Sequence, residues 1–161
     1  MFALLNRLLR RQDGIAATEL GLVTPVFLLL FLSVTELGNM IYYSITIEKG
    51  MRSAVTYAAR NEFPLTQTVI DNTVNLARTG ALDPSAPPLV AGYADPAANV
   101  TVSTKQYQQT IGGQSADVDV PVVVLSVAVP YVPLMKFVTE NFFGDFNPTI
   151  RLTHEQAMIG D

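Results

Sequence analysis

The sequence predicts an α+β protein: a long amino-terminal transmembrane helix continues into a small periplasmic domain whose short antiparallel sheet packs on the helix. Two observations predict this fold. Residues 20–35 carry no charged side chain and are mostly apolar, which suits a helix that crosses a bilayer. Farther along, from residue 98, apolar and polar residues alternate, as they do in half-buried strands.

Composition limits the domain organisation and the chemistry that this chain can have. A chain of 161 residues is long enough for one membrane segment and one modest domain. It contains no cysteine, which excludes disulfides, thiolate catalysis and cysteine metal sites. The net charge is −4 and the basic residues form no stripe outside the amino-terminal leader, so nucleic acid is not an expected partner.

The first 14 residues are a basic leader that contains Arg7, Arg10 and Arg11. The positive-inside rule places this leader in the cytoplasm and the rest of the chain outside it. We predict a leader over 1–14, a transmembrane helix over 15–43 that contacts membrane lipid, and a periplasmic α+β domain over 44–161. A secretory signal peptide is the alternative, but no small-x-small cleavage site follows the apolar run.

Glu19 lies at the start of the apolar run, five residues after Gly14. An ionised carboxylate in hydrocarbon costs several kcal/mol, which suggests a partner. If the chain is cut after Gly14, the new ammonium of Ile15 lies one helical turn from Glu19, in an i, i+4 relation. This arrangement resembles that of a type IV prepilin. The alternative is an unpaired glutamate in the cytoplasmic headgroup region.

Pro25 lies within the predicted span, four residues after Gly21. Proline removes one helical hydrogen bond, so we expect a kink or local melting near Gly21 and Pro25, although membrane helices also tolerate proline. Glu36 is expected at the outer interface, with a contact to another membrane helix as the alternative. Tyr42 and Tyr43 follow as an interfacial aromatic anchor.

Beyond the span the apolar residues keep the helical period to Ala59, and Phe63-Pro64 ends the helix. Thr66 or Thr68 is expected to cap a second helix that ends near Arg78. Strands are predicted over 98–109, 117–129 and 149–159, with a Gly112-Gly113 turn after the first strand and a short helix over 134–143.

No catalytic, metal or cofactor site is expected. His154 is the only histidine, and its neighbour Glu155 points to the opposite face of a strand. Asp117 and Asp119 share one strand face, where a calcium site is the less favoured interpretation. The chain is therefore interpreted as a non-enzymatic protein.

Three segments resemble one family. Gly14-Ile-Ala-Ala-Thr-Glu19-Leu-Gly-Leu-Val-Thr-Pro25, Glu36-Leu-Gly38 and the Ala/Arg-rich helix of residues 51–60 are similar to the TadE-like (TadE or TadF) minor pseudopilins of Tad/Flp (type IVc) pilus systems. The resemblance implies cleavage after Gly14 by a prepilin peptidase and an assembly role that involves Glu19. It implies contacts with other pilins and the inner-membrane assembly platform. Leu20 departs from the major pilins, which carry tyrosine there.

The rival interpretation is a membrane-tethered periplasmic binding or scaffold domain that is never cut. In that case Glu19 is incidental and the leader remains as part of the anchor.

Overall fold

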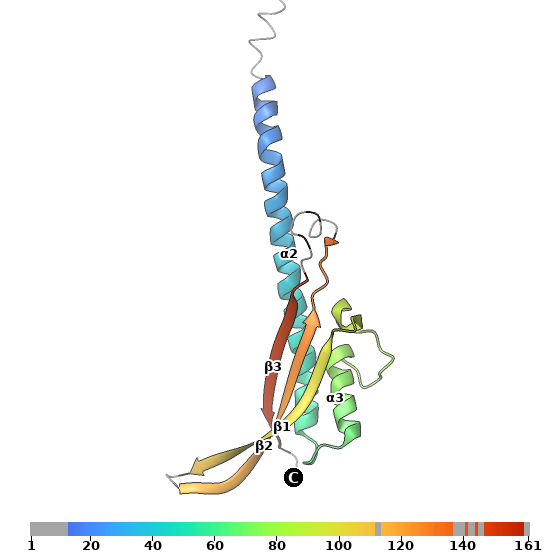
Figure 1. Cartoon of the computed structure of the whole chain (residues 1–161), viewed down its shortest axis with the longest axis vertical. Coiled ribbons are helices and arrows are strands. Elements are labelled where there is room, and N and C mark those ends of the chain that lie inside the picture. Colours follow the sequence, from blue (N-terminus) through green and yellow to red (C-terminus); the bar gives the residue numbers. More distant parts are fainter. Residues whose placement is uncertain (1–12, 112–113, 137–140, 142–143, 145–146, 160–161) are drawn as a thin grey trace, which may run out of the picture. The chain divides into compact units, whose positions relative to one another are not determined.

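The computed structural model describes residues 13–111, 114–136, 141, 144 and 147–159 (Figure 1). The elements follow the order α2 (Asp13–Ala59), α3 (Gln67–Thr79), the 3-10 helix η1 (Ala91–Ala94), β1 (Asn99–Ile111), β2 (Gln114–Pro130) and β3 (Thr149–Ala157). The chain divides into two compact units between Gly38 and Asn39. The predicted α+β class is confirmed. The predicted leader lies almost wholly outside the described residues.

Helix α2 has 47 residues, which gives a length of roughly 70 Å at the standard rise. It ends at Ala59, as the apolar period predicts. Pro25 lies inside the helix, and the helical backbone is continuous across Gly21 and Pro25. A bend at that point stays a prediction.

The sheet has three antiparallel strands in the order β1-β2-β3, with β2 in the centre. Leu125 on β2 pairs with Val102 on β1 and with His154 on β3. Both strands of the β1–β2 hairpin extend closer to its tip than predicted. Their outer residues are largely polar and lack the alternation on which the prediction depends. The Gly112-Gly113 turn lies outside the described residues.

The hydrophobic core of the second unit lies between the carboxyl-terminal half of α2 and one face of the sheet. Along α2 the buried side chains recur every three or four residues, as in an amphipathic helix. Their partners on β2 are every second residue, as in a strand with one face inward. The main members are Tyr43, Ile47, Met51, Ala54, Val55 and Ala58 on α2, with Val123, Leu125, Val127 and Val129 on β2.

Helix α3 packs against the same part of α2 and confirms the predicted second helix. Thr66 occupies the position before its first residue but forms no side-chain cap. Gly80 ends it in the left-handed conformation at φ 74°, and its N–H donates to the carbonyl of Leu76. Gly50 on α2 lets the two helices approach, because a Cβ there would lie 2.7 Å from the Ala77 carbonyl oxygen. Most of the predicted helix over 134–143 lies outside the described residues.

Candidate functional site

The amino-terminal half of α2 is apolar on every side. Residues 16–31 are all exposed, and an apolar window of this helix has a mean hydropathy of 2.1 with none of it buried. The helix is therefore long and apolar enough to cross a membrane. The exposed large side chains include Leu20, Leu22, Val23, Val26, Phe27, Leu28, Leu29, Leu30, Phe31 and Val34. A helix that is hydrophobic all round requires lipid or other apolar helices around it.

Three hydroxyl groups in this half are satisfied by the helix itself. The side chain of Thr24 donates to the Leu20 carbonyl at 2.6 Å. Those of Ser33 and Thr35 donate to the carbonyls four residues earlier, at 2.8 and 2.9 Å. An unsatisfied donor in hydrocarbon costs several kcal/mol. These internal hydrogen bonds make the polar residues compatible with a membrane.

Glu19 is the exception in this apolar surface. Its side chain is exposed on α2, and Leu20 and Leu22 beside it are exposed as well. Gly14 and Ile15 lie in the first turn of the same helix, so Ile15 is about 6 Å from Glu19 along the axis. A chain that began at Ile15 would place its ammonium one turn from the carboxylate, and the positive end of the helix dipole would favour that carboxylate further.

Gly21 and Pro25 lie one turn apart, immediately after Glu19. Pro25 has no N–H, so the carbonyl of Gly21 loses its usual helical donor. A Cβ at Gly21 would meet nothing within 4 Å. Close backbone approach by another helix is therefore sterically open at this point. Glu36, near the other end of the apolar run, is half-buried, and its role stays a prediction.

A buried aromatic cluster marks the beginning of the second unit. The side-chain amide of Asn39 donates to the Tyr131 hydroxyl at 2.7 Å, and the rings of Tyr43 and Tyr131 meet edge to face with centroids 5.2 Å apart. The N–H of Gly92 donates to the Tyr43 hydroxyl. Of the two tyrosines predicted as an interfacial anchor, Tyr42 is 68% exposed but Tyr43 is only 7% exposed. Tyr43 therefore belongs to the domain core.

Sequence reasoning also missed a polar network on the exposed face of the sheet. Lys105 on β1 forms an ion pair with Glu155 on β3 at 2.9 Å, and the Tyr107 hydroxyl donates to the other oxygen of Glu155 at 3.3 Å. The hydrogen bond between Lys105 and Glu155 lowers the pKa of the carboxyl group and raises the pKa of the ammonium. Cross-strand register decides this contact, which sequence spacing alone does not reveal.

The remaining polar candidates form no evident reactive site. His154 is half-buried and pairs in register with Leu125. No group of three metal-ligating side chains occurs among the residues that the structure describes. The side chains of Asp117 and Asp119, predicted to share a strand face, lie outside the described part.

Burial strongly perturbs one titratable group in the domain core, Tyr93. Its side chain is 1% exposed, and its hydroxyl has no hydrogen-bond partner among the described residues. Burial raises the pKa of Tyr93 to about 12, although nearby Arg78 acts in the opposite direction. The group is far from ionising at neutral pH, so this tyrosine serves packing rather than acid–base chemistry.

The comparison with known protein families concerns α2 and the two residues that follow it. The model of the TadE-like protein family matches residues 14–61. The match begins at Gly14 and includes Glu19 and Pro25. Searches of the curated proteins and of the solved structures gave no match. The resemblance to the TadE-like proteins is therefore confirmed over residues 14–61.

Proposed function

We propose that the chain is a minor pseudopilin needed for assembly of a Tad/Flp type IVc pilus, a structure for adhesion, surface attachment and biofilm formation. The observation that carries the proposal is the TadE-like match that starts at Gly14, together with an exposed Glu19 on an apolar helix. In this role the chain is not an enzyme and needs no metal or cofactor. Its helix and domain act through contacts with other proteins.

The proposed processing step is hydrolysis of the Gly14–Ile15 peptide bond by a prepilin peptidase. Water supplies a hydroxyl to the new Gly14 carboxylate, and the Ile15 nitrogen becomes an ammonium. That ammonium pairs with Glu19 of its own chain or of a neighbouring subunit. Either charge alone is costly in lipid, whereas the pair is accommodated. A pair between subunits would also fix the axial register of packed helices.

The proposed topology follows from the leader and the apolar helix. The basic leader lies in the cytoplasm, α2 crosses the inner membrane once, and the domain lies in the periplasm or in the extracellular pilus. The expected partners are the prepilin peptidase, other pilins and pseudopilins, the inner-membrane assembly platform and membrane lipid, with no nucleic acid.

The first test is the intact mass and amino-terminal sequence of the protein purified from its host membrane. We expect a mature chain that begins at Ile15, and an uncut chain when the prepilin peptidase is deleted. A chain that still begins at Met1 or Phe2 in the normal host would refute the processing step. It would favour the rival function, an uncleaved membrane-tethered binding or scaffold domain.

Glu19→Ala tests the assembly role, with Glu19→Asp as the matched control that keeps the charge. We expect Glu19→Ala to abolish pilus assembly while the protein remains inserted in the membrane, because the buried ammonium loses its partner. Glu19→Asp should retain part of the assembly. Normal pili with Glu19→Ala would mean that the carboxylate is incidental, as the tethered-domain interpretation holds.

A further inference from the structure

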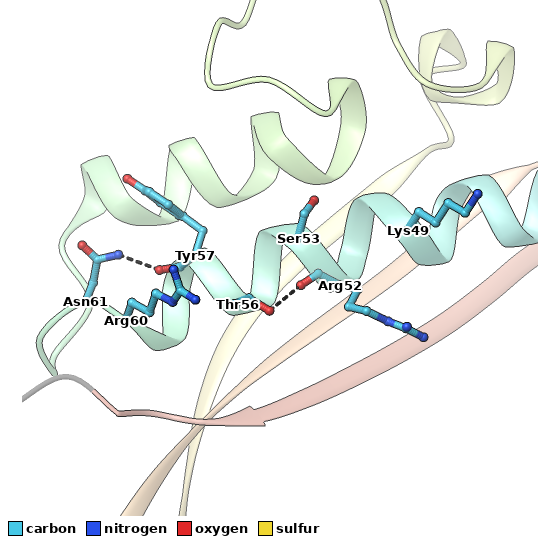
Figure 2. A pocket seen from close by; sticks show the side chains of 7 residues that line it. All are labelled: Lys49, Arg52, Ser53, Thr56, Tyr57, Arg60 and Asn61. Atoms are coloured by element: carbon cyan, nitrogen blue, oxygen red, sulfur yellow. Dashed lines mark hydrogen bonds between the residues drawn. The ribbon is translucent and has the colours of Figure 1, made fainter.

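The exposed surface of α2 changes from apolar to polar after Ile45. Before this point Ile41, Tyr42 and Ile45 itself are exposed. Beyond it an open groove follows the helix, and the residues that line it are charged or polar: Lys49, Arg52, Ser53, Thr56, Tyr57, Arg60 and Asn61 (Figure 2). The change indicates the point along α2 where apolar surroundings give way to water.

The place of this change matches the thickness of a bilayer. At the standard rise, residues 15–45 extend about 46 Å along the helix axis, and a bilayer with its headgroup regions is about 40–45 Å thick. The predicted span over 15–43 therefore reaches the far headgroups at the turn that contains Tyr42 and Ile45. Aromatic side chains with a polar tip, such as tyrosine, are enriched at this depth.

Strand β2 runs antiparallel to α2 and ends beside this turn (Figure 1). At Pro121 it lies level with the end of α2, because the N–H groups of residues 158 and 159 donate to the carbonyls of Pro121 and Ala59, both at 2.9 Å. One residue after β2, the ring of Tyr131 meets the ring of Tyr43 edge to face. The chain therefore leaves the sheet at the level of the last residue of the predicted span.

The connection between β2 and β3 begins and ends at this level. Its ends are held together, because the Tyr131 N–H donates to the Pro148 carbonyl at 2.8 Å. Just after Tyr131, the side chains of Val132 and Leu134 are 40% and 64% exposed. The exposed Lys136 suits a lipid surface, since lysine can bury its stem and keep its ammonium among the headgroups. By sequence, residues 132–148 contain four of the chain's eight phenylalanines.

Five exposed apolar side chains thus lie at one level of the domain, and we call them the apolar group: Ile41, Tyr42, Ile45, Val132 and Leu134. Elsewhere in the described part of residues 39–161, the exposed large apolar side chains are spread over four other places in the chain: Phe63, Leu82 with Leu89, Tyr107, and Ile159. Single exposed apolar residues need no explanation, whereas a group of them marks a contact.

A bilayer fits this contact because the apolar group lies on two sides of α2. Tyr43 faces the sheet, and Ile41 and Ile45 are each two residues from it, which is about 200° around the helix. Val132 follows Tyr131, on the side of the sheet. A single partner helix would cover one side of α2, whereas lipid surrounds the helix at one level.

We propose that the apolar group contacts the lipid of the membrane that α2 crosses, at the boundary between the headgroups and the acyl chains. The start of the β2–β3 connection is then a second membrane contact of the domain, in addition to α2. Two contacts restrict the tilt of the domain over the bilayer, which a single helix does not. The inference deepens the proposed function and rests on its single-pass topology for the presence of the membrane.

The test measures the depth of single spin labels by electron paramagnetic resonance. The chain has no cysteine, so each cysteine variant carries one label, and the full chain is reconstituted into vesicles of phosphatidylethanolamine and phosphatidylglycerol. Leu134→Cys tests the proposed contact, and Ile41→Cys tests the span itself. Ile159→Cys is the control, because Ile159 is also an exposed apolar residue but lies beside Ala59, about 21 Å beyond Ile45 along α2.

Oxygen concentrates in lipid, whereas a nickel chelate stays in water, so the ratio of their collision rates with the label reports its depth. We expect the ratio at Leu134→Cys to approach that at Ile41→Cys and to be several times higher than that at Ile159→Cys. Adding Val132→Asp to the Leu134→Cys chain should lower the ratio, because a charge is disfavoured among the acyl chains. Val132→Leu, the matched control, should keep the ratio.

Three results would overturn the contact. These are equal ratios at Leu134→Cys and Ile159→Cys, few collisions of either reagent with the Leu134→Cys label, which would mean that protein covers it, or no response to Val132→Asp. A lipid-like ratio at Ile41→Cys in the same experiment would then leave the span and the pseudopilin function standing. Water-like ratios at both Ile41→Cys and Leu134→Cys would refute the span as well, and the amino-terminal sequence tests the processing step separately.

Discussion

The two halves of α2 form one continuous helix but have opposite surfaces. In the amino-terminal half, large apolar side chains such as Phe27 and Leu28 are 66% and 56% exposed. In the carboxyl-terminal half, Ile47 and Met51 are 0% and 1% exposed. The first half has apolar residues on all sides, whereas the second has one apolar face covered by the sheet and α3.

The difference shows how one helix serves two surroundings. The first half presents leucine and phenylalanine in every direction, which suits lipid or a bundle of apolar helices. The second half places small residues, such as Gly50, Ala54 and Ala58, on its covered faces. Small residues let neighbouring backbones approach closely.

The largest expected effect on stability comes from shortening one large side chain in each half of α2. Met51→Ala should lower the free energy of unfolding of the domain by about 2–5 kcal/mol, because it leaves a cavity in the core. Phe27→Ala should leave that value unchanged. Urea unfolding of the full chain in detergent micelles, followed by circular dichroism, measures both. Equal losses of unfolding free energy for the two variants would contradict the difference between the two halves of the helix.

Insertion into the membrane should respond in the opposite way. Leu28→Arg places a charge near the middle of the apolar run and should disfavour insertion by about 3 kcal/mol. Ile45→Arg is the matched control, because Ile45 is also exposed, at 45%, but lies beyond the predicted span. Extraction of host membranes with alkaline carbonate reports the inserted fraction. The comparison fails if Ile45→Arg is released as readily as Leu28→Arg.

The pH dependence of stability tests the core that covers the carboxyl-terminal half of α2, through the buried Tyr93. Its pKa is raised to about 12 when folded from an ordinary value of about 10, so the folded state holds the proton more tightly. The associated stability is fully present below pH 10 and is lost as pH rises towards 12, by roughly 2–3 kcal/mol.

Removing this hydroxyl should flatten the pH dependence. Tyr93→Phe should be neutral or slightly stabilising at pH 7, because the buried hydroxyl lacks a partner among the described residues. Between pH 9 and 11, the free energy of unfolding of Tyr93→Phe should then fall less steeply with pH than that of the parent chain. Identical slopes for Tyr93→Phe and the parent would refute this assignment.

The smallest effect compares two glycines within the helix. Gly50→Ala should destabilise the domain by about 1–2 kcal/mol, since crowding against the Ala77 carbonyl outweighs the gain in helix propensity. Gly38→Ala should be neutral or should stabilise the helix by up to about 1 kcal/mol, because nothing lies within 4 Å of the added Cβ. Thermal unfolding in micelles measures both. Shifts of the same sign would contradict the comparison.

Much of the fold was predictable because its signals are periodic. The apolar helical period predicted that α2 continues beyond the apolar run to Ala59, and alternation predicted the strands. The hairpin strands were predicted too short, since their polar ends have no buried face to impose a pattern. Gly14 and Glu19 stood out because a carboxylate beside a long apolar run is unusual.

The sequence by itself determined the apolar helix, the basic amino-terminal stretch, the TadE-like segment and the succession of strands, because each depends on neighbours along the chain. Only the tertiary structure decided that Tyr43 is buried, that Lys105 meets Glu155, and that the cations on α2 line one open groove. These features depend on strand register and on how α3 and the sheet cover α2. Such contacts join residues far apart in the chain, which local periodicity cannot specify.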